Sequence, residues 1–252
     1  MSRVFDIPAV TMIWKRELIR FGRDRMQIAG SLARPVLWLL ILGLGMGSAF
    51  PGFGHVPYTA FLFPGIVAMN LIYGSFRSAI SIIWDRECGL LKEMLVAPIS
   101  RASIALGKSA SGATVACLQG GLVFCFVPVL GISVDLWRLL VGIPIMFLIA
   151  FPLTAMGLLL ASRMTSFEGF GTLANFVVMP MFFLSGAVFP MSSAPPFLRI
   201  LGKLNPLTYG VDLLRDVFYG VHAHSLVLSV GILLAFSTLS IAGAVWAFSR
   251  RS

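Results

Sequence analysis

The sequence has few charged residues, and they are unevenly distributed. Asp, Glu, Lys and Arg make up 12% of its 252 residues, about half of the roughly 25% typical of soluble domains. None of them occurs in 35–76, 109–134, 139–162, 169–198 or 217–249. A helix needs about 20 mainly apolar residues to cross a bilayer, so each stretch can hold at least one span. This scarcity of charge excludes soluble enzymes and soluble nucleic-acid-binding domains, and it predicts an all-α polytopic membrane protein.

Cysteine is also scarce, and its spacing argues against a metal site. Cys88, Cys117 and Cys125 contain no C-x-x-C pair, so we expect three free thiols and no bound metal. The first 34 residues carry seven basic residues but no short apolar core followed by a small-residue cleavage site. We therefore expect no cleaved signal peptide, with the first hydrophobic run acting as its own insertion signal.

The sequence lacks the residues of three common energy-supplying or catalytic sites. A phosphate-binding loop around 107–109 would need glycine where Ala102 stands. An intramembrane serine protease built on Ser185 would need a histidine at membrane depth, yet all three histidines fall in predicted outer segments. Ion-coupled carriers usually bury acidic residues in their spans, which are almost absent here. The chain is therefore predicted not to be an enzyme, and to hold no cofactor of its own.

The charge-free stretches predict six spans. The first stretch is interrupted at 51–57 by a Pro- and Gly-rich segment that no helix would cross. The predicted spans lie near 33–50, 58–84, 109–130, 138–162, 169–190 and 225–248. If both termini are cytoplasmic, 14 of the 19 basic residues lie on that side and four on the other. The positive-inside rule favours this orientation and accounts for the net charge of +9.

Residues 5–28 predict an amphipathic helix in front of the first span. One face carries Val10, Ile13, Trp14, Leu18, Phe21 and Ile28. We expect Arg16, Arg20 and Arg23 on the opposite face. Basic amphipathic helices of this kind lie along the cytoplasmic membrane surface. A solvated helix leading into the first span is the alternative.

Two segments between the spans also predict short helices. The cytoplasmic loop 85–108 carries a helical stripe of Leu90, Leu91, Met94 and Leu95, and it ends before Pro98. Such a helix is suited to docking into a groove on a partner protein, although a second surface-lying helix fits the pattern equally. The outer segment 191–224 predicts two short helices around Asn205-Pro206, partly embedded at the outer face.

A charged residue and a glycine pair stand out inside the predicted spans. Arg77 precedes Trp84 by seven residues, which is about 10 Å along a helix. It either snorkels to the cytoplasmic surface or faces the bundle, where it would pair with an anionic headgroup. Gly43 and Gly47 have the G-x-x-x-G spacing that lets two spans approach closely, which makes them candidate dimer contacts.

Several motifs, in this order along the chain, resemble one family. They are YTAFLFPG at 58–65, DRECGLL at 85–91, LVAP at 95–98, FLSGAVFP at 183–190 and NPLTY at 205–209. Together with the amphipathic start and the long outer segment, they resemble the permease subunit of type-2 ABC exporters, in the nodulation-factor and daunorubicin exporter branch. The resemblance covers essentially the whole chain.

The resemblance implies a homodimeric permease in a bacterial inner membrane, bound to two copies of a separate ATPase that holds ATP and Mg²⁺. Segment 85–98 resembles the coupling helix, and its matching residues are Arg86, Glu87, Leu90, Leu91, Met94, Leu95 and Pro98. Helix 5–28, with Trp14, Arg16, Arg20 and Phe21, is expected to touch the ATPase as well. Outer helices around Pro195 and Asn205 would help to cap the transport pathway.

The resulting hypothesis is that ATP binding closes the ATPases and that the loop helices carry this motion into the spans. The dimer interface, lined by the first, second and fifth spans, would then open outward. Predicted path residues are Arg77, Met179, Phe182, Phe183, Phe189, Asn205 and Tyr209. Methionine and phenylalanine suit an amphipathic or lipid-like substrate, such as a glycolipid, a saccharide-lipid or a hydrophobic drug. Helix packing or lipid contact is the alternative for each, and a stand-alone secondary carrier or intramembrane enzyme is the alternative for the chain.

Overall fold

The computed structural model describes residues 6–45, 57–97, 99–128 and 134–249. These ranges are almost entirely helical and contain no strand, which confirms the predicted all-α class. Within them, five helical segments are long and apolar enough to cross a membrane, and α9 (Phe167–Phe183) is apolar but shorter. The five are Arg25–Gly43, Tyr58–Glu87, Arg101–Phe126, Leu136–Arg163 and Leu226–Ser249. The chain is a polytopic membrane protein.

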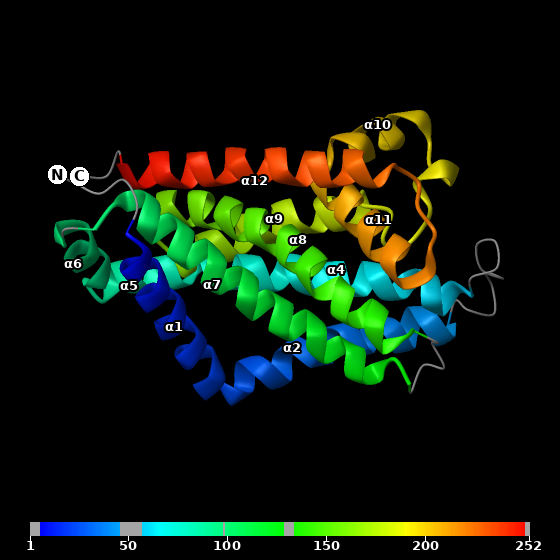
Figure 1. Cartoon of the computed structure of the whole chain (residues 1–252), viewed down its shortest axis with the longest axis horizontal. Coiled ribbons are helices and arrows are strands. Elements are labelled where there is room, and N and C mark those ends of the chain that lie inside the picture. Colours follow the sequence, from blue (N-terminus) through cyan, green and yellow to red (C-terminus); the bar gives the residue numbers. More distant parts are fainter. Residues whose placement is uncertain (1–5, 46–56, 98, 129–133, 250–252) are drawn as a thin grey trace.

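The bundle is built around α4 (Tyr58–Ala79). This helix is apolar on all sides, and nearly all of its residues are buried, as expected for a helix in the centre of a bundle. Helices α7 (Arg101–Leu122) and α8 (Leu136–Arg163) pack along it, and α12 (Leu226–Ser249) packs on α8. Figure 1 shows these helices running lengthwise through the molecule.

The N-terminal segment forms two helices that meet in a V at Asp24 (Figure 1). Helix α1 (Ile7–Arg23) ends there because Asp24 leaves helical backbone geometry, and its carboxylate caps α2 (Arg25–Trp38) by accepting from the Gln27 N–H at 2.9 Å. The prediction of one helix over 5–28 is therefore wrong at its end. The first candidate span begins at Arg25 instead of near 33, so Arg34 lies well inside this helix instead of at its start.

The predicted span 169–190 is wrong in its last seven residues. Helix α9 ends at Phe183, and the chain turns at Ser185 and Gly186, where a φ of +74° favours glycine. Helix α4 approaches this turn so closely that a Cβ at Gly65 would meet Ala187 at 2.5–2.8 Å. Apolar residues continue through the turn, so hydropathy alone does not reveal it.

Short helices mark the two ends of the bundle. At one end lie α5 (Ser81–Glu87) and α6 (Leu90–Val96), and at the other lie α10 (Pro196–Leu204) and α11 (Pro206–Tyr219) (Figure 1). Single-turn or irregular stretches complete the described chain: η1 (Leu39–Leu44), η2 (Val123–Phe126) and η3 (Met191–Ser193). Because α7 already begins at Arg101, Lys108 lies within that helix and not in the loop before it.

Candidate functional site

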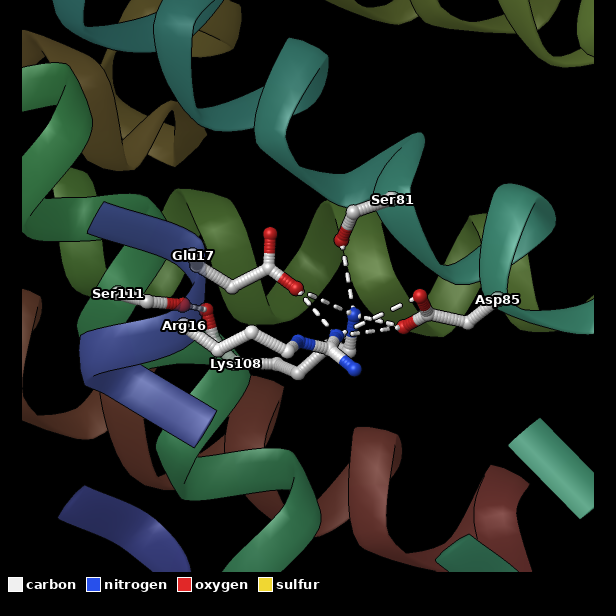
Figure 2. Close-up of polar contacts among 6 residues, drawn as sticks. All are labelled: Arg16, Glu17, Ser81, Asp85, Lys108 and Ser111. Carbon is white, nitrogen blue, oxygen red and sulfur yellow. Dashed lines mark hydrogen bonds and ion pairs between the residues drawn. The ribbon is translucent and has the colours of Figure 1, made fainter. Parts of the chain in front are cut away.

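Four charged side chains from three helices meet near α5. Arg16 and Glu17 come from α1, Asp85 from α5 and Lys108 from α7, and we call these four residues the charge cluster. Figure 2 shows their charged ends converging on one point, with Ser81 beside them. The cluster joins the N-terminal helix to the ends of two spans.

The Lys108 ammonium group is the centre of the charge cluster. It contacts the Asp85 carboxylate and donates hydrogen bonds to Glu17 Oε1 at 3.1 Å and to Ser81 Oγ at 3.0 Å. Arg16 Nη2 contacts the same two carboxylates, 2.6 Å from Glu17 Oε1 and 3.1 Å from Asp85 Oδ2. Two cations therefore balance two anions, and each anion contacts both cations.

The charges of the cluster are largely buried, so each of them needs a partner of opposite charge. The side chains of Lys108 and Asp85 are 1% and 5% exposed, and a buried charge is tolerated when it is paired and hydrogen-bonded. For Glu17, burial by itself would raise the pKa, but the charges of Lys108 and Arg16 outweigh it and lower the pKa below its ordinary value of 4.5. Glu17 is thus held in its ionised form.

The charge cluster is not apparent from the sequence. Arg16 was predicted on the face of helix 5–28 opposite its apolar residues, which is wrong, because its side chain turns toward Asp85. Lys108 was considered only as part of a rejected phosphate loop. One available signal was the spacing of Ser81 and Asp85, which puts both on one helix face. Their partners on α1 and α7 are too distant in sequence to be inferred from that spacing.

Two arginines tie the same end of the molecule to two more helices. Arg86 on α5 donates to the backbone carbonyls of Ser162, at 2.7 Å, and of Met164 at the end of α8. Arg101 at the start of α7 donates to the carbonyls of Phe248 and Ser249, both at 2.9 Å, at the end of α12. These terminal carbonyls lack partners within their own helices. Because of these contacts, a displacement of α5 would also displace α1, α7 and α8.

The apolar stripe of α6 faces the protein instead of facing outward. Leu91 joins the main core, and Met94 packs with Ile13 of α1 and Ile104 of α7. These two side chains therefore bind α6 to its own chain, and the assignment of 85–98 as the coupling segment stays a prediction. The exposed residues of this segment include Glu87, Cys88, Glu93 and Val96, while Arg86 and Leu90 are half-buried. The Leu95 side chain and Pro98 lie outside the described residues.

Helix α1 lies against protein along one side. The Trp14 indole donates to Thr114 Oγ1 at 3.0 Å, and Ile13 packs so closely on Gly107 that a Cβ there would meet it at 3.1 Å. The Arg20 guanidinium lies 5.9 Å from the centre of the Trp84 ring, and Phe21 lines a cavity beside it. The apolar face of α1 is thus used at least partly for contact with α7, whereas we had expected contact with the membrane surface.

Three predicted path residues are buried and make contacts within the chain. Phe182 is buried with its ring 5.9 Å from that of Trp38. Asn205 caps α11 and donates to the Met181 carbonyl at 2.6 Å, and the Tyr209 hydroxyl donates to the Lys203 carbonyl at 2.9 Å. These side chains hold the turn regions together and do not present a free surface. The other four, Arg77, Met179, Phe183 and Phe189, are exposed.

Of the predicted glycine pair, Gly43 is described and Gly47 lies outside the described residues. Gly43 faces its own chain, since a Cβ there would meet Thr59 at 3.2 Å. In the outer segment, His224 Nδ1 lies 3.2 Å from Asp212 Oδ2, and its ring packs on Tyr209. Among the described residues, no group of three or more His, Cys, Asp or Glu side chains could hold a metal ion.

Comparisons with known proteins agree on one family. The family described as ABC-2 type transporter matches residues 8–219, a range that includes the whole charge cluster. Nodulation protein J of Rhizobium leguminosarum bv. trifolii is 30% identical over 211 residues, covering 82% of this chain and 80% of that protein. Inner membrane transport permease YadH of Escherichia coli (strain K12) is 28% identical over 237 residues, covering 90% of each chain.

Proposed function

The chain belongs to the ABC-2 type transporter family, and from this premise we propose that it is the membrane subunit of an ATP-driven exporter. Family membership makes it a transport permease that associates with an ABC ATPase subunit. The proposed substrate is amphipathic or lipid-like, and it leaves the cytoplasm or the inner leaflet. The proposed assembly is a permease homodimer in the inner membrane with two ATPase copies and cytoplasmic termini.

The observation that carries the proposal is the set of polar contacts around α5 and α6. The charge cluster joins α5 to α1 and α7, and Arg86 joins it to the end of α8. An ATPase that pushed on α5 and α6 would thus move the ends of several helices together. This arrangement supports α5–α6 as the place where ATP-driven motion enters the permease, because buried charge pairs resist separation.

The exposed side of α6 is the surface that we assign to the ATPase. Val96 is 87% exposed, and Glu93 beside it is exposed and acidic. An apolar side chain with an adjacent charge is a reasonable anchor for a groove that accepts a short helix. Met94 is a poorer choice for testing the contact, because its loss would first disturb the packing of α6 on α1.

The test first establishes whether an adjacent gene encodes an ABC ATPase. That ATPase is then co-purified with this chain, and ATP hydrolysis by the complex is measured. We expect Val96→Asp to reduce ATPase recovery by about tenfold or more, since a buried interface anchor is worth at least about 1.4 kcal/mol. Val221→Asp is the matched control, because Val221 is also exposed but lies beyond α11 at the other end of the molecule. It should leave recovery unchanged.

If Val96→Asp left both the recovery of the ATPase and ATP hydrolysis by the complex unchanged, α6 could no longer be assigned as the ATPase contact. A neighbouring gene without a phosphate-binding loop would weaken the exporter proposal itself. The alternative of an intramembrane serine enzyme has no support from Ser185, whose hydroxyl donates to the Phe182 carbonyl at 2.6 Å, while His222 and His224 contact Asp216 and Asp212.

A further inference from the structure

A cavity of about 240 Å³ opens between α2, α4, α7 and α9. Its polar lining includes Arg34, Asn70, Arg77, Gln119 and Asn175, and none of its lining residues is acidic. A second cavity of about 400 Å³ adjoins it beneath the V of α1 and α2, and Arg77 lines both. We call the first one the arginine cavity.

The two arginines of this cavity have no acidic partner among the described residues. Arg34 lies 4.0 Å above the ring of Tyr73, and the side chains of Arg34 and Arg77 are both exposed. Both come from helices long and apolar enough to span the membrane. A cation in such a helix is costly to keep and commonly marks a substrate or ion site. Guanidinium groups bind phosphate oxygens through paired N–H···O contacts.

Gln119 provides an independent indication of a ligand. Its side chain is 2% exposed, and its Nε2 has no hydrogen-bond partner among the described residues, although it lines the arginine cavity. Its backbone carbonyl is used, since it accepts from Asn70 Nδ2 at 2.9 Å. Buried donors are nearly always satisfied in folded proteins. Gln119 Nε2 is one of five buried side-chain atoms without a partner among the described residues, and it is the one whose residue lines the arginine cavity. An acceptor oxygen on a molecule bound beside the two arginines would satisfy it once the amide turns toward the opening.

An apolar surface continues from the cavity along α9. Phe176, Met179 and Phe183 are exposed and spaced at helical intervals after Asn175, over about 12 Å of helix. Helix α2 lies beside this surface, because the Trp38 ring is 6.3 Å from that of Phe183. A molecule with a charged head in the cavity could thus lay an apolar tail along α9.

We propose that the arginine cavity binds the phosphate-type anionic headgroup of an amphipathic substrate. Arg34 and Arg77 hold the anion, Gln119 donates a hydrogen bond to it, and the apolar tail follows α9. The inference rests on the exporter function proposed above and narrows its substrate class. Neutral saccharide-lipids and cationic drugs would leave both arginines without a partner.

The test uses the purified permease alone, in nanodiscs of phosphatidylcholine, titrated with radiolabelled dodecyl phosphate. We expect saturable binding that Arg34→Gln and Arg77→Gln each weaken by about tenfold or more. Gly171→Leu should abolish it, because Gly171 lines the cavity and a Cβ there meets nothing within 4 Å, so the new side chain projects into open space. Gly231→Leu on α12, a position equally open to a Cβ but outside the cavity, should bind normally.

Competition experiments identify the source of the anion. Inorganic phosphate should not displace dodecyl phosphate, and equal competition would replace the amphiphile assignment with a free-anion site. A minor fraction of phosphatidylglycerol in the nanodisc should leave the binding of dodecyl phosphate intact. If phosphatidylglycerol abolished that binding, the cavity would be assigned to a resident lipid, and the substrate proposal would be overturned.

Wild-type affinity in the double variant Arg34→Gln/Arg77→Gln would remove the site altogether. Each variant is checked for a monodisperse elution profile, so a loss of binding is not confused with unfolding. No ATPase is present in this assay. Its outcome is therefore independent of the recruitment test for α6, and either proposal can fail without the other.

Discussion

The charge cluster and the arginine cavity place basic side chains in adjacent parts of the molecule, with opposite arrangements. In the cluster, Lys108 and Arg16 each contact both Glu17 and Asp85, and the four charges sum to zero. The arginine cavity, which Arg34 and Arg77 line, has no lining acid, whereas Glu17 and Asp24 line the adjoining cavity that Arg77 also reaches. Ser81, which accepts a hydrogen bond from Lys108 of the cluster, lies only one helical turn, about 6 Å, after Arg77.

The difference separates charges that hold the fold from charges that are available to a ligand. Neutral, buried pairs keep α1, α5 and α7 in one arrangement whether or not a substrate is present. Unbalanced arginines in an open cavity contribute little to that arrangement and can be neutralised by something that binds. Substitutions in the two places should therefore have opposite effects on stability and on binding.

The largest expected effect is that of Lys108→Met. It removes the central cation and leaves two largely buried carboxylates with Arg16 alone, so we expect a loss of about 3–5 kcal/mol in the free energy of unfolding. Thermal unfolding of the purified permease, followed by tryptophan fluorescence, measures this change.

A double variant tests whether the loss comes from the pair itself. Lys108→Met/Asp85→Asn should be more stable than the sum of the single losses predicts, because it removes one charge of each sign. Strictly additive losses would show that Lys108 and Asp85 do not stabilise one another.

A smaller loss of stability is expected when the pH is lowered. The pKa of Glu17 is lowered in the folded protein by Lys108 and Arg16 against the opposing effect of burial. A lowered carboxyl pKa contributes stability that is fully present above the unfolded-state value, about 4.5, and is lost as the pH falls below it. Unfolding temperatures measured from pH 7 to pH 3.5 should fall most steeply below about pH 4.5. Glu17→Gln should flatten that fall, and an unchanged slope would contradict the role of Glu17.

The smallest stability effect should be that of Arg77→Gln. Its side chain is exposed and pairs with no acid in the described residues, so we expect a change within about 0.5 kcal/mol in the free energy of unfolding. The same fluorescence measurement compares it directly with Lys108→Met. A comparable loss in both variants would mean that Arg77 also supports the fold, and the contrast between the two sites would disappear.

Much of the architecture follows from local sequence properties. The charge-free runs locate the apolar helices, and Pro206 separates the two outer ones. The errors occur where apolar residues continue through a change of direction, as at Ser185–Gly186, or where a helix extends past the apolar run, as at the start of α7. At Ser185–Gly186 the apolar residues continue while the backbone turns. At the start of α7 the apolar run has not yet begun, although the backbone is already helical.

The candidate sites were less predictable for a different reason. Arg77 could be singled out because a charge in an apolar run is visible in the sequence. Its counterpart Arg34 stood at the very start of the span predicted near 33–50 and was not singled out, because the helix boundary at Asp24 was missed. Met94 was predicted to face a partner, yet packing against Ile13 and Ile104 uses its side chain within the chain.

The sequence by itself determined that this protein is helical and lies in a membrane, because hydrophobicity is a property of each residue and sums along a segment. Only the tertiary structure decided which charges are neutralised. Lys108 and Glu17 are 91 positions apart, and their contact depends on how α1 and α7 pack. Helix packing therefore separates the buried pairs of the charge cluster from the open arginines of the cavity.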